Sequence, residues 1–149
     1  MVRIMITFER LREISTDKDY TQEDIANKLN IKMKTYSKYE TNVNIPSLET
    51  IYNISKLYGL NIDYVIGIND KRTKKDYKDY NPKLVANNLK VLREGKHMSR
   101  QQLAIRLGIT QSSIHRYENM LSNASLQIIY KYHKIFNISF DDLCTKNLK

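Results

Sequence analysis

The chain of 149 residues carries a net charge of +9, and its 41% apolar and 28% charged residues are typical of a soluble globular protein. No apolar run approaches the ~18 residues of a membrane span, and charges at positions 9 and 10 come too early for a signal peptide, so we expect a cytoplasmic protein. A single cysteine excludes an internal disulfide, and the sequence lacks HExxH, GxSxG and Gly-rich phosphate loops, which predicts no enzyme, no cofactor and no small-molecule ligand.

Local signals predict the helix boundaries of the first half of the chain. Thr21 is followed three residues later by Asp24, a capping pattern for a helix over QEDIANKL, and Asn30 tolerates the left-handed conformation that ends a helix. The later boundaries are Glu40, where a third helix ends, Ser47, where a fourth begins, and Asn61, which caps a short fifth.

A charged linker is predicted over residues 68–81, because GINDKRTKKDYKDYN has no apolar periodicity. The chain therefore divides into a first domain over residues 1–67 and a second over 82–149. Two interpretations of the lysines in KRTKK stay open: nonspecific phosphate contacts, or simple solvation of a flexible linker. About 15 residues of extended chain would reach roughly 50 Å.

The second half repeats the same kinds of signal. Asn81-Pro82 starts a helix, since proline is tolerated at the first helical position, and Ser99 with Gln102 forms a capping box for RQQLAIRL. Gly108 ends that helix, and the remaining boundaries are marked by Glu118, Ser125 and Ser139. Cys144 is expected to be buried in a C-terminal helix.

These parallels come from an internal repeat. A shift of 78 positions aligns residues 11–65 with 89–143 without a gap, and thirteen of the 55 pairs are identical. The preserved positions are mainly those of the apolar helix faces, which include Tyr39, Tyr52, Tyr117 and Tyr130, so these tyrosines are expected in the core rather than stacked on single-stranded bases. The sequence predicts an all-α protein of two tandem domains with five short helices each.

Charge is distributed unevenly between the copies. Residues 1–69 carry nine basic and nine acidic side chains, residues 70–83 six and three, and residues 84–149 ten and four. A basic second half favours a polyanionic partner, with nucleic acid ahead of an anionic membrane surface. No two of the three histidines, His97, His115 and His133, have metal-ligand spacing with a carboxylate or thiol, so no metal site is expected.

Each copy also contains two short helices joined by a tight turn, the second with a polar outer face. This is the pattern of a helix-turn-helix, whose second helix enters the DNA major groove while the first crosses the backbone. The apolar residues Ile31, Tyr36 and Tyr39 recur as Ile109, Ile114 and Tyr117, whereas the polar residues between them change. Shared packing with different outward residues is what two domains with different DNA targets need.

The segments TQEDIANKLNIKMKTYSKYETNVNIPSLETI and SRQQLAIRLGITQSSIHRYENMLSNASLQII resemble the lambda-repressor-like, Cro/XRE-type helix-turn-helix domain. The resemblance covers both copies, nearly all of the chain outside the linker and the last few residues. It implies a five-helix bundle that binds operator DNA, as in bacterial, phage or mobile-element transcription factors.

The resemblance also implies a set of DNA-contacting positions. Base-facing positions are Met33, Lys34, Ser37 and Lys38 in the first copy and Gln111, Ser112, His115 and Arg116 in the second. Phosphate-contacting positions are Gln22 and Arg100 at the start of the second helix, and Thr41 and Asn119 just beyond the third. Lys32 is a further phosphate candidate because of its charge.

The side-chain chemistry of the two recognition helices is unequal. Gln111 can pair bidentately with adenine and Arg116 with guanine, each pair contributing about 1–3 kcal/mol of discrimination. In the first copy Met33 offers only apolar contact, and the lysines are mobile charges better suited to phosphates. We therefore expect the second copy to read more of the DNA sequence than the first.

The family's first helix carries an arginine that pairs with the glutamate at the end of the recognition helix. In the second copy Arg93 and Glu118 match this pattern, which predicts a structural ion pair. In the first copy Ser15 takes the arginine position, so Glu40 needs another partner, for which Arg12 is the candidate. The first domain is accordingly expected to be less stable.

The leading hypothesis is a transcriptional regulator that binds double-stranded DNA and represses by covering a promoter, since the chain leaves no room for an effector domain. Its target would be an asymmetric or direct pair of elements, or a palindrome bound by a homodimer. The alternative is a protein-interaction module, antitoxin-like or anti-repressor, in which only one copy contacts DNA and exposed apolar residues such as Met33, Val43 and Met120 dock a partner.

Overall fold

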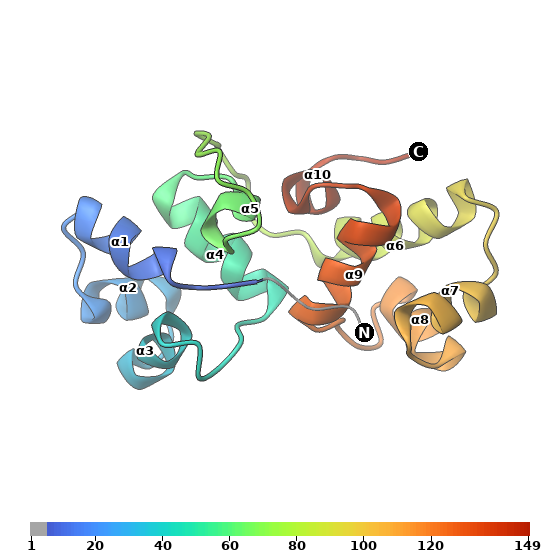
Figure 1. The fold of residues 1–149 in the computed structure, drawn as a ribbon, viewed down its shortest axis with the longest axis horizontal. Helices are drawn as coiled ribbons and strands as arrows, with labels where there is room; N and C mark the ends of the chain where they lie inside the picture. The colour runs from blue at the N-terminus through green and yellow to red at the C-terminus, as the bar shows by residue number, and fades with distance from the viewer. Residues whose placement is uncertain (1–5) are drawn as a thin grey trace. The chain divides into compact units, whose positions relative to one another are not determined.

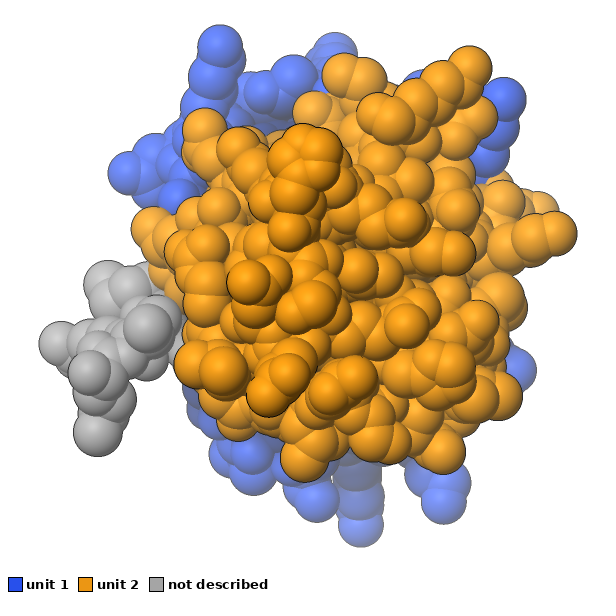
Figure 2. Space-filling view, turned by 90° about the vertical axis from the view of Figure 1, so that its right-hand side faces the viewer, with its two compact units in different colours: residues 1–78 blue, residues 79–149 orange. Residues whose placement is uncertain are grey.

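The computed structural model describes residues 6–149, which form ten helices in two compact units (Figure 1). Unit 1 spans residues 1–78 and unit 2 residues 79–149, and Figure 2 colours them separately. Unit 1 contains α1 (Arg10–Asp17), α2 (Gln22–Leu29), α3 (Met33–Glu40), α4 (Leu48–Tyr58) and α5 (Ile62–Val65). Unit 2 contains α6 (Pro82–Gly95), α7 (Arg100–Leu107), α8 (Gln111–Glu118), α9 (Leu126–Phe136) and α10 (Phe140–Thr145). The predicted all-α fold with two tandem five-helix domains is confirmed.

The helices begin where the capping residues predict. The Thr21 hydroxyl accepts from the Asp24 amide while the Asp24 carboxylate accepts from the Thr21 amide, and Ser99 and Gln102 form the same reciprocal pair. Each such cap satisfies two backbone N–H groups that the first helical turn leaves without an internal partner. The Asn81 side chain accepts from the Leu84 amide ahead of the proline that opens α6. The other hydroxyl caps are Ser47, Thr110, Ser125 and Ser139.

Each unit has its own apolar core, built from one face of every helix. The core of unit 1 contains Phe8, Leu11, Ile14, Ile25, Tyr36, Leu48, Ile51, Tyr52, Ile54, Tyr58, Ile62 and Val65. The core of unit 2 contains Val85, Leu89, Leu103, Leu107, Ile114, Leu126, Ile129, Tyr130, Tyr132, Phe140, Leu143 and Cys144. Tyr52 and Tyr130 are buried as predicted, whereas Tyr39 and Tyr117 are only half-buried.

At two corresponding core positions, the two units have a tyrosine and an isoleucine in opposite order. Unit 1 has Tyr36 on α3 and Ile54 on α4, and at the corresponding positions unit 2 has Ile114 on α8 and Tyr132 on α9, all fully buried. Each core thus holds one tyrosine and one isoleucine at this pair of positions, so total side-chain volume is kept, which is the kind of core change that proteins tolerate best.

Residues 71–78 differ from the flexible linker that the sequence predicts, because they pack on unit 1. The Asn61 amide donates to the Thr73 carbonyl over 3.0 Å, and the Lys75 amide donates to the Gly59 carbonyl over 2.9 Å. We call residues 71–78 the strap. The Asn61 side chain, predicted to cap α5, makes no such cap and instead binds the strap backbone at Lys71 and Thr73.

Among residues 6–149, no helix combines the length and apolarity that crossing a bilayer requires.

Candidate nucleic-acid interface

The helix pairs α2–α3 and α7–α8 have the geometry of a helix-turn-helix. Asn30 and Gly108 follow α2 and α7 in the left-handed conformation, with φ of 57° and 71°. Three residues separate the helices in each pair. Ile31 and Ile109 donate their amides back to the carbonyls of Ala26 and Ala104, which closes the turn.

Packing orients the second helix of each pair. On α3 the side chain of Tyr36 is fully buried, and on α8 that of Ile114 is fully buried. The glutamates that end these helices, Glu40 and Glu118, are also buried. Two inward residues one turn apart fix the rotation of a helix about its axis, because they mark the same face. The opposite face of each helix is left for a partner.

The exposed face of α8 contains all four predicted base-facing residues. Gln111, Ser112, His115 and Arg116 are exposed. An open hollow is lined by Arg100, Thr110, Gln111, Ser112 and His115, so the start of α7 and the start of α8 border the same space. The Thr110 hydroxyl caps α8 by accepting from the Ser113 amide over 3.1 Å.

Hydrogen bonds orient the side chains at the far end of α8. The Asn119 amide group donates to the His115 carbonyl over 2.8 Å and lies 3.3 Å from His115 Nδ1. Because an amide NH2 only donates, this contact suits the His115 tautomer that accepts at Nδ1. The Arg116 Nη2 atom donates to the Leu121 carbonyl over 3.3 Å, which directs the guanidinium along the loop after α8.

The exposed face of α3 has a different composition. Met33, Lys34 and Lys38 are exposed, and Met33 presents 49% of its surface, whereas Ser37 is half-buried. Lys32 occupies the N-cap position and supplies no capping hydrogen bond. This face therefore offers flexible positive charges and an apolar thioether rather than planar hydrogen-bonding groups.

The residues predicted to contact phosphates have partners within their own domains. Gln22 Nε2 donates to Glu40 Oε2 over 2.8 Å, and Arg100 Nε donates to Glu118 Oε1 over 3.2 Å. Arg100 is only partly covered, and it lines the hollow beside α8. The side chains of Thr41 and Asn119 are exposed and bind carbonyls of the last turn of α3 and α8 respectively.

In unit 2 the predicted ion pair between Arg93 and Glu118 is present. It is bidentate: Arg93 Nε lies 2.7 Å from Glu118 Oε2, and Arg93 Nη2 lies 3.0 Å from Oε1. Arg93 Nη1 also donates to the Met98 carbonyl over 2.8 Å. The hydrogen bonds to Glu118 raise the pKa of Arg93 above its ordinary value. Arg93 on α6 and Arg100 on α7 thus tie both helices to the end of the recognition helix.

Glu40, the corresponding glutamate of unit 1, has fewer hydrogen-bonded and charged partners than Glu118. The Glu40 side chain is 2% exposed, and its cationic neighbour is Arg12, 3.6 Å away and largely in solvent. Glu40 Oε1 has no hydrogen-bond partner among the described residues. The nearby tyrosines add no second charge, because burial raises the pKa of Tyr58 to about 12 and that of Tyr36 further. Ser15, which corresponds to Arg93 in the repeat, donates its hydroxyl to the Arg12 carbonyl.

The sequence patterns did not predict that the strap packs on unit 1. The strap sequence KRTKKDYK has six charged residues and one aromatic residue, Tyr77, which is buried. That isolated aromatic is the one signal in the sequence that could have indicated packing. The partners of the strap, at Gly59, Leu60 and Asn61, could not be identified without the fold.

A family model described as Helix-turn-helix matches residues 8–65 and 89–143, one match in each unit. The chain is similar to the HTH-type transcriptional regulator ImmR of Bacillus subtilis, at 37% identity over 71 residues covering 48% of this chain and 55% of ImmR. It is also similar to the cryptic phage CTXphi transcriptional repressor RstR of Vibrio cholerae, at 32% identity over 69 residues covering 46% of this chain and 60% of RstR.

A third similar protein is the uncharacterized HTH-type transcriptional regulator YobD of Bacillus subtilis, at 30% identity over 82 residues covering 55% of this chain and 66% of YobD. The matches thus span just over half to two thirds of these relatives. No solved structure matches the chain. With the family model matched in both units, on the same helix pairs that form the turn, the chain belongs to the Cro/XRE-type helix-turn-helix family of transcriptional regulators.

Proposed function

We propose that this protein is a sequence-specific regulator that binds double-stranded DNA through both units, with α8 reading bases more selectively than α3. The observation that carries the proposal is the shared exposed face of α8. Gln111, Ser112 and His115 on this face line one hollow together with the partly covered Arg100, and Arg116 is exposed on the same helix. Groups that read base edges and a group that binds phosphate then meet one duplex together.

The groups on α8 suit particular bases. Gln111 can bind adenine through two hydrogen bonds, and Arg116 can bind guanine O6 and N7 in the same bidentate manner. In the tautomer that accepts from Asn119 at Nδ1, His115 can donate from Nε2 to a purine N7 or a guanine O6. Each of these contacts depends on the base identity, so losing one changes specificity as well as affinity.

The α3 face supports a weaker, positioning role. Lys34 and Lys38 are long, flexible cations that bind phosphates without sequence preference. Met33 is suited to the methyl group of thymine. Because the planar amide and guanidinium groups of α8 have no counterpart here, unit 1 discriminates fewer base pairs than unit 2.

Repression by covering a promoter is the proposed consequence of binding. The matched relative RstR is named a transcriptional repressor, whereas another, BcrR of Enterococcus faecalis, is named a transcriptional activator. In a reconstituted transcription reaction, a promoter that overlaps the selected site should lose transcript as protein is added. A rise in transcript would replace repression by activation and leave DNA recognition intact.

One exposed apolar position after α3 is shared by the two units and gives no argument for a protein-docking role of unit 1. Val43 is exposed in the loop after α3, but its counterpart Leu121 is exposed in unit 2 as well. Exposure at this position is therefore a property of both copies and does not set one of them apart.

The test is selection of a random double-stranded DNA pool by the intact chain at near-physiological salt. Arg116→Ala is then expected to weaken binding to the selected site by about 5- to 150-fold and to relax preference at one base pair, the loss of one bidentate contact. Arg106→Ala is the matched control, because Arg106 is an exposed arginine of unit 2 outside the α8 face. Equal losses for both variants, or no enriched sequence, would refute the proposal.

A further inference from the structure

A second open hollow in unit 2 lies beside the loop that joins α6 to α7. It has a volume of about 510 Å³, and its lining residues are Lys96, His97 and Met98 of the loop, Gln102 and Arg106 of α7, and Ile135 of α9. Met98 and Ile135 are half-buried, whereas the other four residues are exposed. The hollow therefore has an apolar base and a polar rim, and its six lining residues include two cations and no carboxylate.

This hollow lies on a different side of α7 from the proposed DNA interface. Gln102 and Arg106 are one helical turn apart, so they share a face of α7. Arg100, which lines the hollow beside α8, precedes Gln102 by two residues and lies about 200° from it around the helix. DNA that contacts α8 and Arg100 consequently leaves the hollow around Arg106 accessible.

Hydrogen bonds hold the loop that forms one wall of the hollow. The amides of Lys96 and Met98 both donate to the Arg93 carbonyl, each over 3.2 Å, and Arg93 Nη1 donates to the Met98 carbonyl over 2.8 Å. The Gln102 side chain accepts from the Ser99 amide over 2.8 Å. Because the backbone around the hollow is already ordered, a ligand that binds there has a smaller entropic cost to overcome.

Unit 1 has different side chains at the six corresponding positions, which are Lys18, Asp19, Tyr20, Asp24, Lys28 and Leu57. Two carboxylates balance the two lysines there. The Tyr20 ring, at the position of Met98, lies 6.4 Å from the Tyr58 ring and 5.3 Å from Lys28 Nζ. Unit 2 has neither the carboxylates nor the tyrosine at these positions. Among the residues that the structure describes, the side chains of Lys96 and Arg106 have no hydrogen-bond or ion-pair partner.

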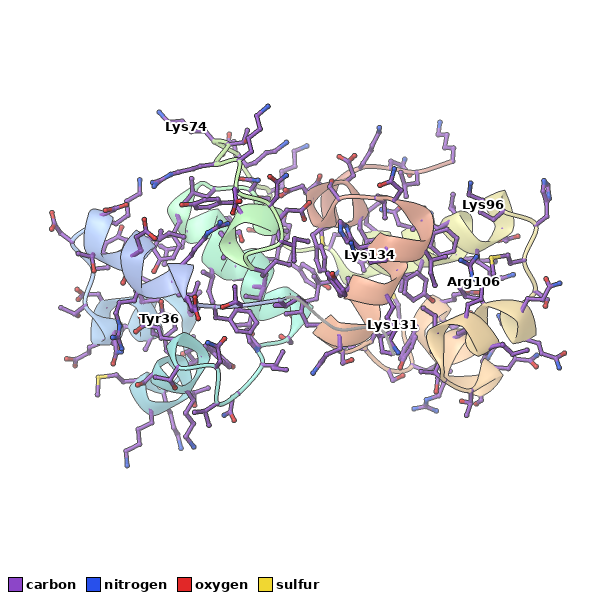
Figure 3. All side chains as sticks on the ribbon, in the orientation of Figure 1. Tyr36, Lys74, Lys96, Arg106, Lys131 and Lys134 are labelled. Atoms are coloured by element: carbon purple, nitrogen blue, oxygen red, sulfur yellow. The ribbon has the colours of Figure 1, made fainter. Side chains whose placement is uncertain are left out.

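We propose that this hollow binds an acidic peptide segment of a partner protein. An apolar side chain of the peptide packs on Met98 and Ile135, and its carboxylates bind Lys96 and Arg106 (Figure 3). A guanidinium matches a carboxylate with two parallel hydrogen bonds. The site is independent of DNA binding by α8.

The shape and chemistry of the hollow favour a peptide over other anions. Sites for small molecules enclose most of their ligand, whereas this hollow is open and leaves room for a chain to continue beyond it. A nucleic-acid phosphate would use the two cations but gain nothing from the apolar base. A peptide that carries an apolar residue next to Asp or Glu uses both.

The experiment selects binders from a random library of peptides of about twelve residues, displayed on phage, with the intact chain. Dissociation constants of the enriched peptides are then measured by fluorescence anisotropy. Enriched sequences should combine Asp or Glu with Leu, Ile or Phe. Lys96→Ala with Arg106→Ala should weaken binding at least ~10-fold, since two charged contacts are lost. Arg116→Ala, an exposed arginine of α8 outside this hollow, is the matched control and should leave binding unchanged.

A second variant gives unit 2 the carboxylates of unit 1 and keeps the local structure. Asp19 and His97 share the left-handed conformation, with φ of 57° and 55°, and Asp24 forms the same capping box as Gln102. His97→Asp with Gln102→Asp should therefore fold and weaken peptide binding at least ~10-fold, because it places negative charges against those of the peptide. Replacing the apolar residue of the peptide by serine should weaken binding at least ~3-fold.

The outcomes separate this site from the DNA interface. Losses in both double variants, with Arg116→Ala unchanged, support the proposal. Peptides that depend on Arg116, or that bind all variants alike, would overturn it, as would a selection that enriches no acidic peptide. Octanoate bound as tightly as the selected peptides would overturn it too, because the ligand would then be a small carboxylate. None of these results changes sequence-specific DNA binding, for which Arg106→Ala is the silent control.

Discussion

The two buried glutamates show how one residue difference changes the electrostatics of a repeated domain. Glu118 accepts from Arg93 and Arg100, so its charge is balanced where water is excluded. Glu40 receives a hydrogen bond from neutral Gln22 and lies 3.6 Å from an exposed arginine. A buried charge is costly when its hydrogen bonds are incomplete. Unit 1 is therefore expected to be the less stable unit.

Ser15→Arg should stabilise unit 1. Position 15 corresponds to Arg93 in the repeat, so the new guanidinium can reach Glu40 Oε1, the oxygen without a partner among the described residues. A charge-assisted hydrogen bond contributes about 1.5–3 kcal/mol. The free energy of opening α3, measured by hydrogen exchange in the intact chain, should rise by up to that amount.

The reciprocal change supplies the control. Arg93→Ser should destabilise unit 2 by about 3–5 kcal/mol, because it leaves Glu118 buried without its bidentate partner. If Ser15→Arg lowers the stability of unit 1 while Arg93→Ser lowers that of unit 2, then the first copy is adapted to a glutamate without an arginine, and our account of Glu40 is wrong.

At the scale of elements, the recognition helices and the strap depend on different kinds of contact. The start of α8 depends on the Thr110 hydroxyl, which caps the amide three residues later, and on Gly108 in the left-handed conformation. Both contacts are local in the chain. The strap depends on Tyr77 reaching a carbonyl 17 residues back. A buried tyrosine and several backbone hydrogen bonds give the strap a defined conformation that its charged composition would not suggest.

Trypsin should test whether the strap is docked in solution. KRTKKDYK contains five lysine or arginine residues, and an undocked segment of this kind is cut rapidly, since exposed loops are preferred sites of proteolysis. Wild-type strap should resist, and Tyr77→Ala should be cut at least ~10-fold faster because local opening becomes easier. Thr73→Ala is the control, as the exposed Thr73 contributes only its backbone to the strap contacts. If trypsin cut the wild type as rapidly as Tyr77→Ala, the strap would be open in solution.

At the scale of the whole molecule, the two units differ in net charge and in the side chains of their recognition helices. Unit 2 has eleven basic and five acidic residues and contains the planar groups that we propose to read bases, whereas unit 1 has fourteen basic and eleven acidic residues. In unit 1, Lys74 of the strap lies at the opposite end of the unit from α3 (Figure 3). Of the two interpretations left open by the sequence, phosphate contacts by Lys74 on the duplex that α3 touches are disfavoured.

The salt dependence of binding should distinguish these lysines. Each lysine that contacts a phosphate contributes about one unit to the slope of log affinity against log salt. Lys34→Ala should lower that slope by about one and weaken binding equally on all duplexes. Lys74→Ala, the matched control, should leave the slope unchanged. A lower slope for Lys74→Ala as well would bring the strap into the DNA interface.

Much of the fold and part of the site could be predicted from the sequence, since they depend on contacts between close neighbours in the chain. The caps at Thr21 and Ser99 and the turns at Asn30 and Gly108 each involve residues within a few positions of one another. The pair Arg93–Glu118 could be predicted because a family pattern records it. The roles of Gln22 and Arg100 beside the buried glutamates could not, since their partners lie 18 residues away on another helix.

By itself, the sequence determined that this protein is two copies of one helical domain whose inward residues are kept and whose outward residues differ. Helix periodicity and capping depend on residues that are close together in the chain, and both copies of the repeat contain these patterns. Only the tertiary structure decided that residues 71–78 belong to unit 1. The physical reason is that Tyr77, Leu60 and Tyr52 become neighbours only after α4 and α5 have folded, so a segment that is charged along the chain acquires a buried side chain and fixed partners in space.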